Sequence, residues 1–258
     1  MTTVENVLLQ RDGPVAILTL NRPAVKNAVD LATMEDLATH VETLRGDAQV
    51  RAVIFSAQGG EAFCSGGDLK AFQALTRWED AYAMSTRMQR ALHALETLPV
   101  PVLGVLNGYA MGGGCEAFLA TDVRIVEDHA YLSFKQLQMG VSLGWGGAAR
   151  LARDVGGRNA LKLVLMGEKL GPQQARDLGL ADEVVARGTG LDRARVLALR
   201  FAQLPPLAVA ALKRMTRQED HARVHQEASV FASTWASRDH QEAVAAFFEK
   251  RDPVWEGR

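Results

Sequence analysis

The chain has 258 residues, 48% of them hydrophobic and 23% charged, a composition that is typical of globular proteins and excludes disordered, collagenous and coiled-coil chains. Its 29 Lys and Arg residues balance 30 Asp and Glu residues to a formal net charge of -1, so no basic field favours nucleic acid or an anionic membrane. With only two cysteines and no run of about 18 apolar residues, we expect a cytoplasmic protein with neither a nucleic-acid nor a membrane partner.

The first half of the chain alternates short apolar segments with amphipathic ones. The spacing of apolar residues from Leu31 to Leu44 predicts a helix, for which Asp30 is a suitable N-cap and Gly46 a stop. A strand, a glycine-rich segment and a helix follow one another twice, which indicates α/β layering with ligands at the glycine turns. We expect strands at 7–10, 15–20, 52–57, 99–106 and 123–126, and further helices at 80–95 and 117–120.

The second half has a different pattern. From Gly146 onward the apolar stripes predict helices only, and Pro205-Pro206 is expected to mark the passage to a helical C-terminal element. The histidines show no metal-site spacing apart from His221 and His225. Because that pair has no further ligand nearby in the sequence, it indicates surface histidines.

Two glycine-rich segments are the candidates for a functional site. In the first, Phe63–Lys70, Asp68 is placed to cap a helix running through 72 and 75, which would leave the N–H of Gly67 free to donate. In the second, Asn107–Glu116, three consecutive glycines precede a helix and would let a ligand approach the backbone closely. Two such N–H groups form an oxyanion hole if they converge on one point.

Two other interpretations of these glycines stay open. Gly-Gly pairs commonly serve tight turns and close packing. The segment Gly112–Ala117 also satisfies the dinucleotide-binding pattern G-x-G-x-x-A. Residues 107–111 separate these glycines from the preceding strand, however, which argues against a dinucleotide site.

Together the two segments resemble the enoyl-CoA hydratase/isomerase, or crotonase, superfamily. Its pattern pairs F-x-x-G-x-D-[LI] with N-G-x-x-x-G-G-G-x-E further along the chain. Leu20–Ala28 is similar to the family's L-N-R-P-x-x-x-N-A. Later segments of the family are similar to Leu165–Glu168, Ala175–Val185 and Phe247–Arg251.

The resemblance implies an α/β fold, a crotonase-like spiral of ββα units with a helical C-terminal trimerisation region. It divides the chain into a spiral core with the acyl-CoA site at residues 1–200 and a helical oligomerisation region at 201–258. Members of this family pack as homotrimers, often paired into hexamers. We expect the same assembly here.

The resemblance also implies roles for individual residues. Gly67 and Gly113 match the two backbone N–H donors that stabilise a thioester enolate, each worth roughly 2.7–4 kcal/mol in the transition state. Coenzyme A is part of the acyl-CoA substrate, and no separate cofactor or metal is expected. The residues that match its contacts are Lys26, Ser65, Asp68 and Leu69, with Phe247 and Lys250 reaching the nucleotide from an adjacent subunit.

Two further residues match the catalytic positions of the hydratases. Glu116 matches the first catalytic glutamate, and its place in the first turn of a helix should favour the ionised form. At the second acid the sequence departs from the family, because an ungapped alignment places Gln136 there, and a slip in the alignment would place Gln138 or Lys135 there instead. An amide cannot exchange a proton, and losing an acid–base group costs about 10² to 10⁴ in rate. Either Glu116 works alone or the reaction is not hydration.

Three functions stay open at this point. Addition of water to a 2-enoyl-CoA is the default of the family. Leu143–Gly147, which contains Trp145, differs from the commoner P-G-x-G-G and resembles the branch that decarboxylates malonyl-type CoA thioesters. Trp145 either walls the acyl pocket or packs in the core. Some relatives bind RNA without catalysis, although the charge balance argues against that function.

Overall fold

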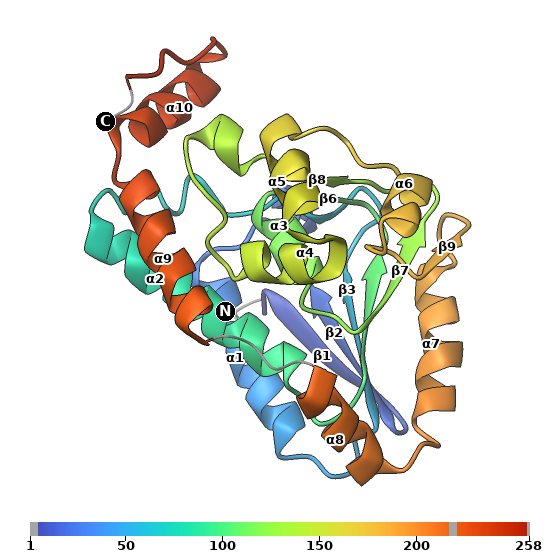
Figure 1. Ribbon diagram of the computed structural model, residues 1–258. Helices are drawn as coiled ribbons and strands as arrows, with labels where there is room; N and C mark the ends of the chain where they lie inside the picture. Colours follow the sequence, from blue (N-terminus) through green and yellow to red (C-terminus); the bar gives the residue numbers. More distant parts are fainter. Residues whose placement is uncertain (1–4, 217–220, 257–258) are drawn as a thin grey trace.

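The computed structural model of the protein describes residues 5–216 and 221–256, and for 221–225 it describes the backbone alone. A six-stranded sheet in the order β1-β2-β3-β5-β7-β9 lies at the centre (Figure 1). β1 and β2 form an antiparallel hairpin, and every later neighbour is parallel. The strands are β1 Val7–Asp12, β2 Val15–Leu20, β3 Ala52–Ala57, β5 Val102–Leu106, β7 Val123–Glu127 and β9 Glu183–Val185.

A second, three-stranded parallel sheet is built from the strands that alternate with these along the chain. It consists of β4 Ala62–Cys64, β6 Tyr109–Met111 and β8 Leu132–Ser133. The chain therefore runs β3-β4-α2, then β5-β6-α3, then β7-β8, adding one strand to each sheet per turn. These repeats form the ββα spiral that the sequence predicts.

Helices cover both faces of the large sheet (Figure 1). Asp30 caps α1 by accepting the N–H of Thr33 at 2.8 Å, and Gly46 ends this helix, as the sequence predicts. The helices are η1 Pro23–Val25, α1 Leu31–Arg45, α2 Trp78–Glu96, α3 Gly113–Phe118, η2 Gln136–Met139, α4 Gly147–Val155, α5 Gly157–Met166, α6 Pro172–Asp177, α7 Gly190–Phe201, α8 Pro206–Thr216, α9 His221–Trp235 and α10 Arg238–Glu249.

The core lies on both sides of the large sheet, and β3 shows how. All six of its side chains are buried. Val53 and Phe55 belong to the larger cluster, which also contains buried side chains of α1 and α2, whereas Ala52 and Ile54 belong to a second cluster shared with α7. Burying a side chain the size of Ile or Phe contributes about 1.5–3 kcal/mol. This two-sided burial explains why the strand is apolar without alternation.

The structure corrects three expectations about the elements. The chain after Gly146 is not purely helical, because β9 pairs with β7 at the edge of the large sheet. The segment after Asp68 forms turns rather than a helix, although the Asp68 carboxylate does accept the N–H of Ala71 at 3.2 Å. The strand expected at 99–106 begins only at Val102, since the two prolines before it lack the N–H that a central strand needs.

The C-terminal helices return to the body of the protein. α9 lies along α2, and α10 continues beyond it at the outer edge of the molecule (Figure 1). Trp235, the last residue of α9, donates its Nε1–H to the carbonyl oxygen of Leu75 at 2.5 Å, and His240 of α10 is bonded to the carbonyl oxygen of Met139. No single helix among the described residues is long and apolar enough to cross a bilayer.

Candidate active site

The two glycine-rich segments lie side by side, because β4 and β6, which lead into them, pair in parallel. The approach is close. A Cβ atom at Gly114 would lie 2.2 Å from the carbonyl oxygen of Cys64, and one at Gly66 would lie 3.5 Å from the backbone nitrogen of Gly113. Only glycine allows this contact at position 114.

The N–H groups of Gly67 and Gly113 are available as donors. Among the residues that the structure describes, neither donates a hydrogen bond to a protein acceptor, whereas Asp68 N–H donates to Val29 and Gly112 N–H to Ser133. Gly113 is the first residue of α3, where the N–H groups have no partner within the helix. Two donors are thus left unpaired on adjacent turns.

The indole of Trp145 covers both glycines. A Cβ atom at Gly113 would lie 2.3 Å from the six-membered ring of the indole, and one at Gly67 would lie 3.8 Å from it. Trp145 is 4% exposed. The indole is therefore packed in the core beside both glycines, and its role as a wall of an acyl pocket stays a prediction.

Glu116 points from α3 into the loop that precedes α4, and it is 2% exposed. Its Oε2 atom accepts the N–H groups of Trp145 at 2.7 Å and Gly147 at 2.9 Å. Its Oε1 atom accepts Nε2–H of Gln136 at 3.0 Å and, at 3.4 Å, the N–H of Gly144. A Cβ atom at Gly147 would lie 2.4 Å from the Glu116 Cγ, so glycine is needed there for the carboxylate to reach the backbone.

Opposing effects act on the proton affinity of Glu116. Burial raises the pKa of its carboxyl group, while the hydrogen bonds from Trp145 N–H and the Gln136 amide lower it; burial prevails. The pKa of Glu116 is therefore higher than that of an exposed glutamate, and the expected effect of its place at the helix start stays a prediction. A raised pKa brings a carboxyl group closer to the range in which it can exchange protons at neutral pH.

The structure brings Gln136 to Glu116, although twenty residues separate them in the sequence. Gln136 is 6% exposed and begins η2. Its Nε2–H group donates to Glu116, whereas its Oε1 atom is buried and has no hydrogen-bond partner among the described residues. Buried acceptors are nearly always paired, so Oε1 is an acceptor left for a ligand or a water molecule.

A second carboxylate, which sequence reasoning missed, approaches the same loop. Glu227 of α9 is 9% exposed and accepts the N–H groups of Gly146 at 2.7 Å and Ala149 at 3.4 Å. Burial, followed by the charge of Glu116, raises the pKa of Glu227 to about 7. No local motif marks this residue, because its contacts are made 78 or more residues away along the chain.

The residues expected to bind coenzyme A lie near the first glycine segment. Ser65 N–H donates to the carbonyl oxygen of Lys26 at 3.0 Å. The ammonium group of Lys26 pairs with Glu61 on the surface. Asp68 is committed to an ion pair with Arg22 at 3.0 Å, and Leu69, which follows it, is half-buried.

Phe247 and Lys250 lie at the far end of α10 (Figure 1). Phe247 is 58% exposed and packs edge-to-face on Phe248. Lys250 adopts a left-handed conformation that ends the helix. Within one chain both residues are therefore on an outer surface.

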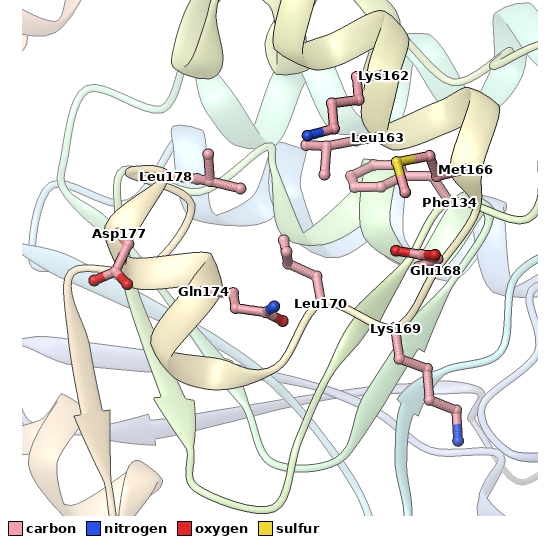
Figure 2. Close-up of a pocket in the computed structure, with 10 residues that line it drawn as sticks. All are labelled: Phe134, Lys162, Leu163, Met166, Glu168, Lys169, Leu170, Gln174, Asp177 and Leu178. Carbon is pink, nitrogen blue, oxygen red and sulfur yellow. The ribbon is translucent and has the colours of Figure 1, made fainter.

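A cavity of about 300 Å³ lies elsewhere, between α5, α6 and Phe134 (Figure 2). Leu163, Met166 and Leu170 supply apolar lining, with charged groups of Lys162 and Asp177 at its rim. None of its lining residues belongs to the Glu116 centre.

Neither cysteine is a candidate nucleophile. Both are fully buried beside the glycine turns, and burial raises the pKa of the Cys64 thiol to about 12. Burial raises the pKa of Cys115 as well, so both thiols stay protonated at neutral pH. Among the residues that the structure describes, no group of three or more His, Cys, Asp or Glu side chains could hold a metal ion, and the side chains of His221 and His225 lie outside them.

The fold is that of the crotonase enzymes. A carnitinyl-CoA hydratase from Mycobacterium avium has the same fold, with a TM-score of 0.89 and 32% identity over 99% of this chain and 100% of that one. The chain belongs to the enoyl-CoA hydratase/isomerase family, whose model matches residues 10–258. It is 32% identical to a probable enoyl-CoA hydratase of Bacillus subtilis, covering 97% of this chain and 98% of that one. It is 31% identical to the 2,3-dehydroadipyl-CoA hydratase of Escherichia coli, covering 99% and 100% respectively.

Proposed function

We propose that this enzyme adds water to a 2-enoyl-CoA thioester. The observation that carries the proposal is the buried pair of Glu116 and Gln136, which holds a proton-binding carboxyl group beside an amide oxygen without a partner. The N–H groups of Gly67 and Gly113 lie on adjacent turns and donate to the thioester oxygen. As in its relatives, coenzyme A is part of the substrate, and the reaction needs no other cofactor.

The reaction places a developing negative charge at the two glycines. The water oxygen bonds to the β-carbon, the double-bond electrons move toward the thioester carbonyl, and the resulting enolate oxygen accepts both N–H groups. Glu116 takes one proton from the water. The same carboxyl group returns a proton to the α-carbon, so atoms and charge balance over the cycle.

The two oxygens of Glu116 have different tasks in this scheme. Oε2 accepts two short backbone hydrogen bonds and is saturated. Oε1 accepts one short bond from Gln136 and a long one from Gly144, so it can accept a further hydrogen bond, which we assign to the attacking water. The open Oε1 atom of Gln136 accepts that water's second hydrogen. Gln136 thereby orients the water without exchanging a proton.

Decarboxylation of a malonyl-type thioester is the competing function, because Gln136 replaces an acid. The surroundings favour hydration. A substrate carboxylate would lie beside two buried glutamates, and the guanidinium of Arg150 in this region already pairs with Glu96 at 2.9 Å. Bringing a further carboxylate into this buried site, where the nearby cation is already paired, is costly.

We also propose a homotrimer, single or paired, as the working assembly. Apolar side chains of the C-terminal region support it: Leu207 and Met215 of α8 are 85% and 74% exposed, and Phe247 of α10 is 58% exposed. Exposed apolar patches of this kind mark association surfaces. Light scattering coupled to size exclusion measures the mass directly, and a monomer would contradict the proposal.

A mass-spectrometric screen tests the function. The purified protein is incubated with enoyl-CoA and carboxyacyl-CoA thioesters of several chain lengths. We expect a product heavier by one water from short 2-enoyl-CoA substrates. Loss of carbon dioxide from a carboxyacyl-CoA, with no hydration, would replace the proposal by the decarboxylase function.

A further inference from the structure

The loop before α4 is held between two buried carboxylates that approach from different elements. Along this loop and the first turn of α4, the N–H groups alternate between the two carboxylates. Those of Trp145 and Gly147 donate to Glu116, whereas those of Gly146 and Ala149 donate to Glu227. Each of the two N–H groups that donate to Glu116 is therefore next in the chain to an N–H group that donates to Glu227.

Other contacts fix the remaining groups of this loop. Ser85 and Gln89 of α2 both donate to the carbonyl oxygen of Gly144, Gln89 at 2.8 Å. Arg150 donates Nη1–H to the carbonyl oxygen of Trp145 at 2.9 Å. These side chains fix carbonyl groups, and the carboxylate of Glu227 is what fixes the N–H of Gly146.

Gly146, whose N–H donates to Glu227, has a left-handed backbone conformation with φ +84°. This conformation costs free energy for most residues, and for glycine it is only one of several accessible conformations. The N–H of Gly146 donates to the Glu227 carboxyl group at 2.7 Å, and a buried N–H that lost this acceptor would be left without a partner. Glu227 therefore favours this conformation over the alternatives.

We infer that Glu227 is a positioning residue for the reaction, which fixes the Trp145 and Gly147 N–H groups, and through them the Glu116 carboxylate, by holding Gly146 from α9. This inference rests on the proposed function of Glu116. Glu227 does not contact the reacting atoms; it acts through the loop. A misplacement of about 1 Å at a reacting group costs about 10²-fold in rate, so loosening this loop has a measurable effect.

The charges around Glu227 add a second readout. The charged groups around this loop are Glu116 from α3 and Arg150 from α4, and Arg150 pairs with Glu96 of α2 at 2.9 Å. α2 also contributes the uncharged Ser85 and Gln89. The influence of two titrating groups is reciprocal. The charge of Glu116 raises the pKa of Glu227, so removing that charge in Glu116→Gln lowers the pH at which Glu227 ionises.

The experiment compares Glu227→Gln, Glu227→Ala and the matched control Glu183→Gln. Glu183 is a carboxylate at the sheet edge, paired with Arg193 at 2.6 Å. For Glu227→Ala we expect kcat with crotonyl-CoA to fall at least about tenfold and KM to stay within threefold. For Glu227→Gln, which keeps one acceptor, we expect a smaller loss of kcat. The control should match the wild type in both kcat and KM.

A second readout needs no substrate. Infrared difference titration, with Glu227→Gln to assign the band, reports the midpoint of Glu227 ionisation in the wild type and in Glu116→Gln. We expect a lower midpoint in Glu116→Gln, because the charge of Glu116 raises the pKa of Glu227. If the wild type hydrates nothing, the proposed function fails and this titration alone decides: a lower midpoint supports the coupling, and an unchanged one overturns it. If Glu227→Ala does not fold, Glu227→Gln carries the test. Unchanged kcat in both Glu227→Ala and Glu227→Gln would overturn the inference.

Discussion

Trp145 is bonded to Glu116 through its backbone and packs on Gly113 through its side chain. The N–H of Trp145 donates to Glu116 Oε2 at 2.7 Å, and a Cβ atom at Gly113 would lie 2.3 Å from its indole. One residue therefore connects the carboxylate to the turn that carries an unpaired N–H donor. A change in the size of the Trp145 side chain is therefore expected to move the Glu116 carboxylate as well.

Glu116→Gln removes proton transfer while it keeps the shape of the side chain. We expect kcat for hydration to fall by about 10² to 10⁴, with thioester affinity within a fewfold. Steady-state kinetics and a binding titration separate the two effects. A variant with near-normal kcat would show that Glu116 only holds the loop before α4.

Gln136→Glu places a second carboxyl group 3.0 Å from Glu116, where the amide now donates. Two carboxylates at this distance raise the pKa of one of the pair. If the enzyme is a hydratase that works with one acid, we expect hydration of crotonyl-CoA to rise at least about tenfold, part of the full acid–base effect, and the pH optimum to move upward. If it is a decarboxylase, turnover of a carboxyacyl-CoA should fall instead. An unchanged rate in both assays would show that Gln136 does not act on the substrate.

Gly113→Ala tests the packing of the second glycine segment. Its Cβ would meet the Trp145 ring, and overpacking of this kind costs about 1–3 kcal/mol. We expect lower stability in urea and a large loss of kcat, because the turn must shift. The matched control is Gly157→Ala at the start of α5, where a Cβ would meet nothing within 4 Å. Equal losses in the two variants would disprove the packing argument.

Trp145→Phe tests whether the indole limits the acyl chain. A smaller ring leaves space beside Gly67 and Gly113. One methylene of fit is worth about 1–3 kcal/mol, so we expect the ratio of kcat/KM for octenoyl-CoA to that for crotonyl-CoA to rise about tenfold or more. Trp78→Phe, in a stacked and partly exposed pair with Tyr82, is the control. The interpretation fails if both variants keep the wild-type ratio.

Glu227 also makes stability depend on pH. Its folded pKa is about 7, against about 4.3 for an unfolded glutamate. The folded state therefore binds more protons between these values, and the contribution of Glu227 to stability falls as the pH rises from about 4.3 to about 7. Glu227→Gln removes this contribution. Relative to wild type, the variant should gain stability in urea between pH 5 and pH 8, and a constant difference would contradict the assigned pKa.

Local spacing predicted the elements whose signals are local. The apolar spacing after Leu31 and the run from Ala52 correspond to α1 and β3. β9 was missed because it is three residues long and only half-buried, so neither alternation nor an apolar run marks it. The turns after Asp68 were predicted as a helix because the cap is present, but the segment packs on α9 instead, with Leu75 bonded to Trp235.

Only the residues of the site that belong to a sequence motif could be predicted. The glycine pattern and the resemblance point to Gly67, Gly113 and Glu116, and the structure brings their segments together. Glu227 could not be found, because its position depends on how α9 packs along α2. The roles of these residues, the coenzyme A contacts and the boundary at residue 200 stay predictions.

The return of α9 to the loop before α4 has a consequence for synthesis. A ribosome that has made the chain through α8 has produced the complete large sheet, both glycine turns and Glu116, yet neither Glu227 nor Trp235. At that stage the N–H groups of Gly146 and Ala149 lack the Glu227 carboxyl group that accepts them in the full chain. Loss of the last forty residues, from a premature stop or a protease, leaves a body with its sheets intact and its reaction centre unfinished.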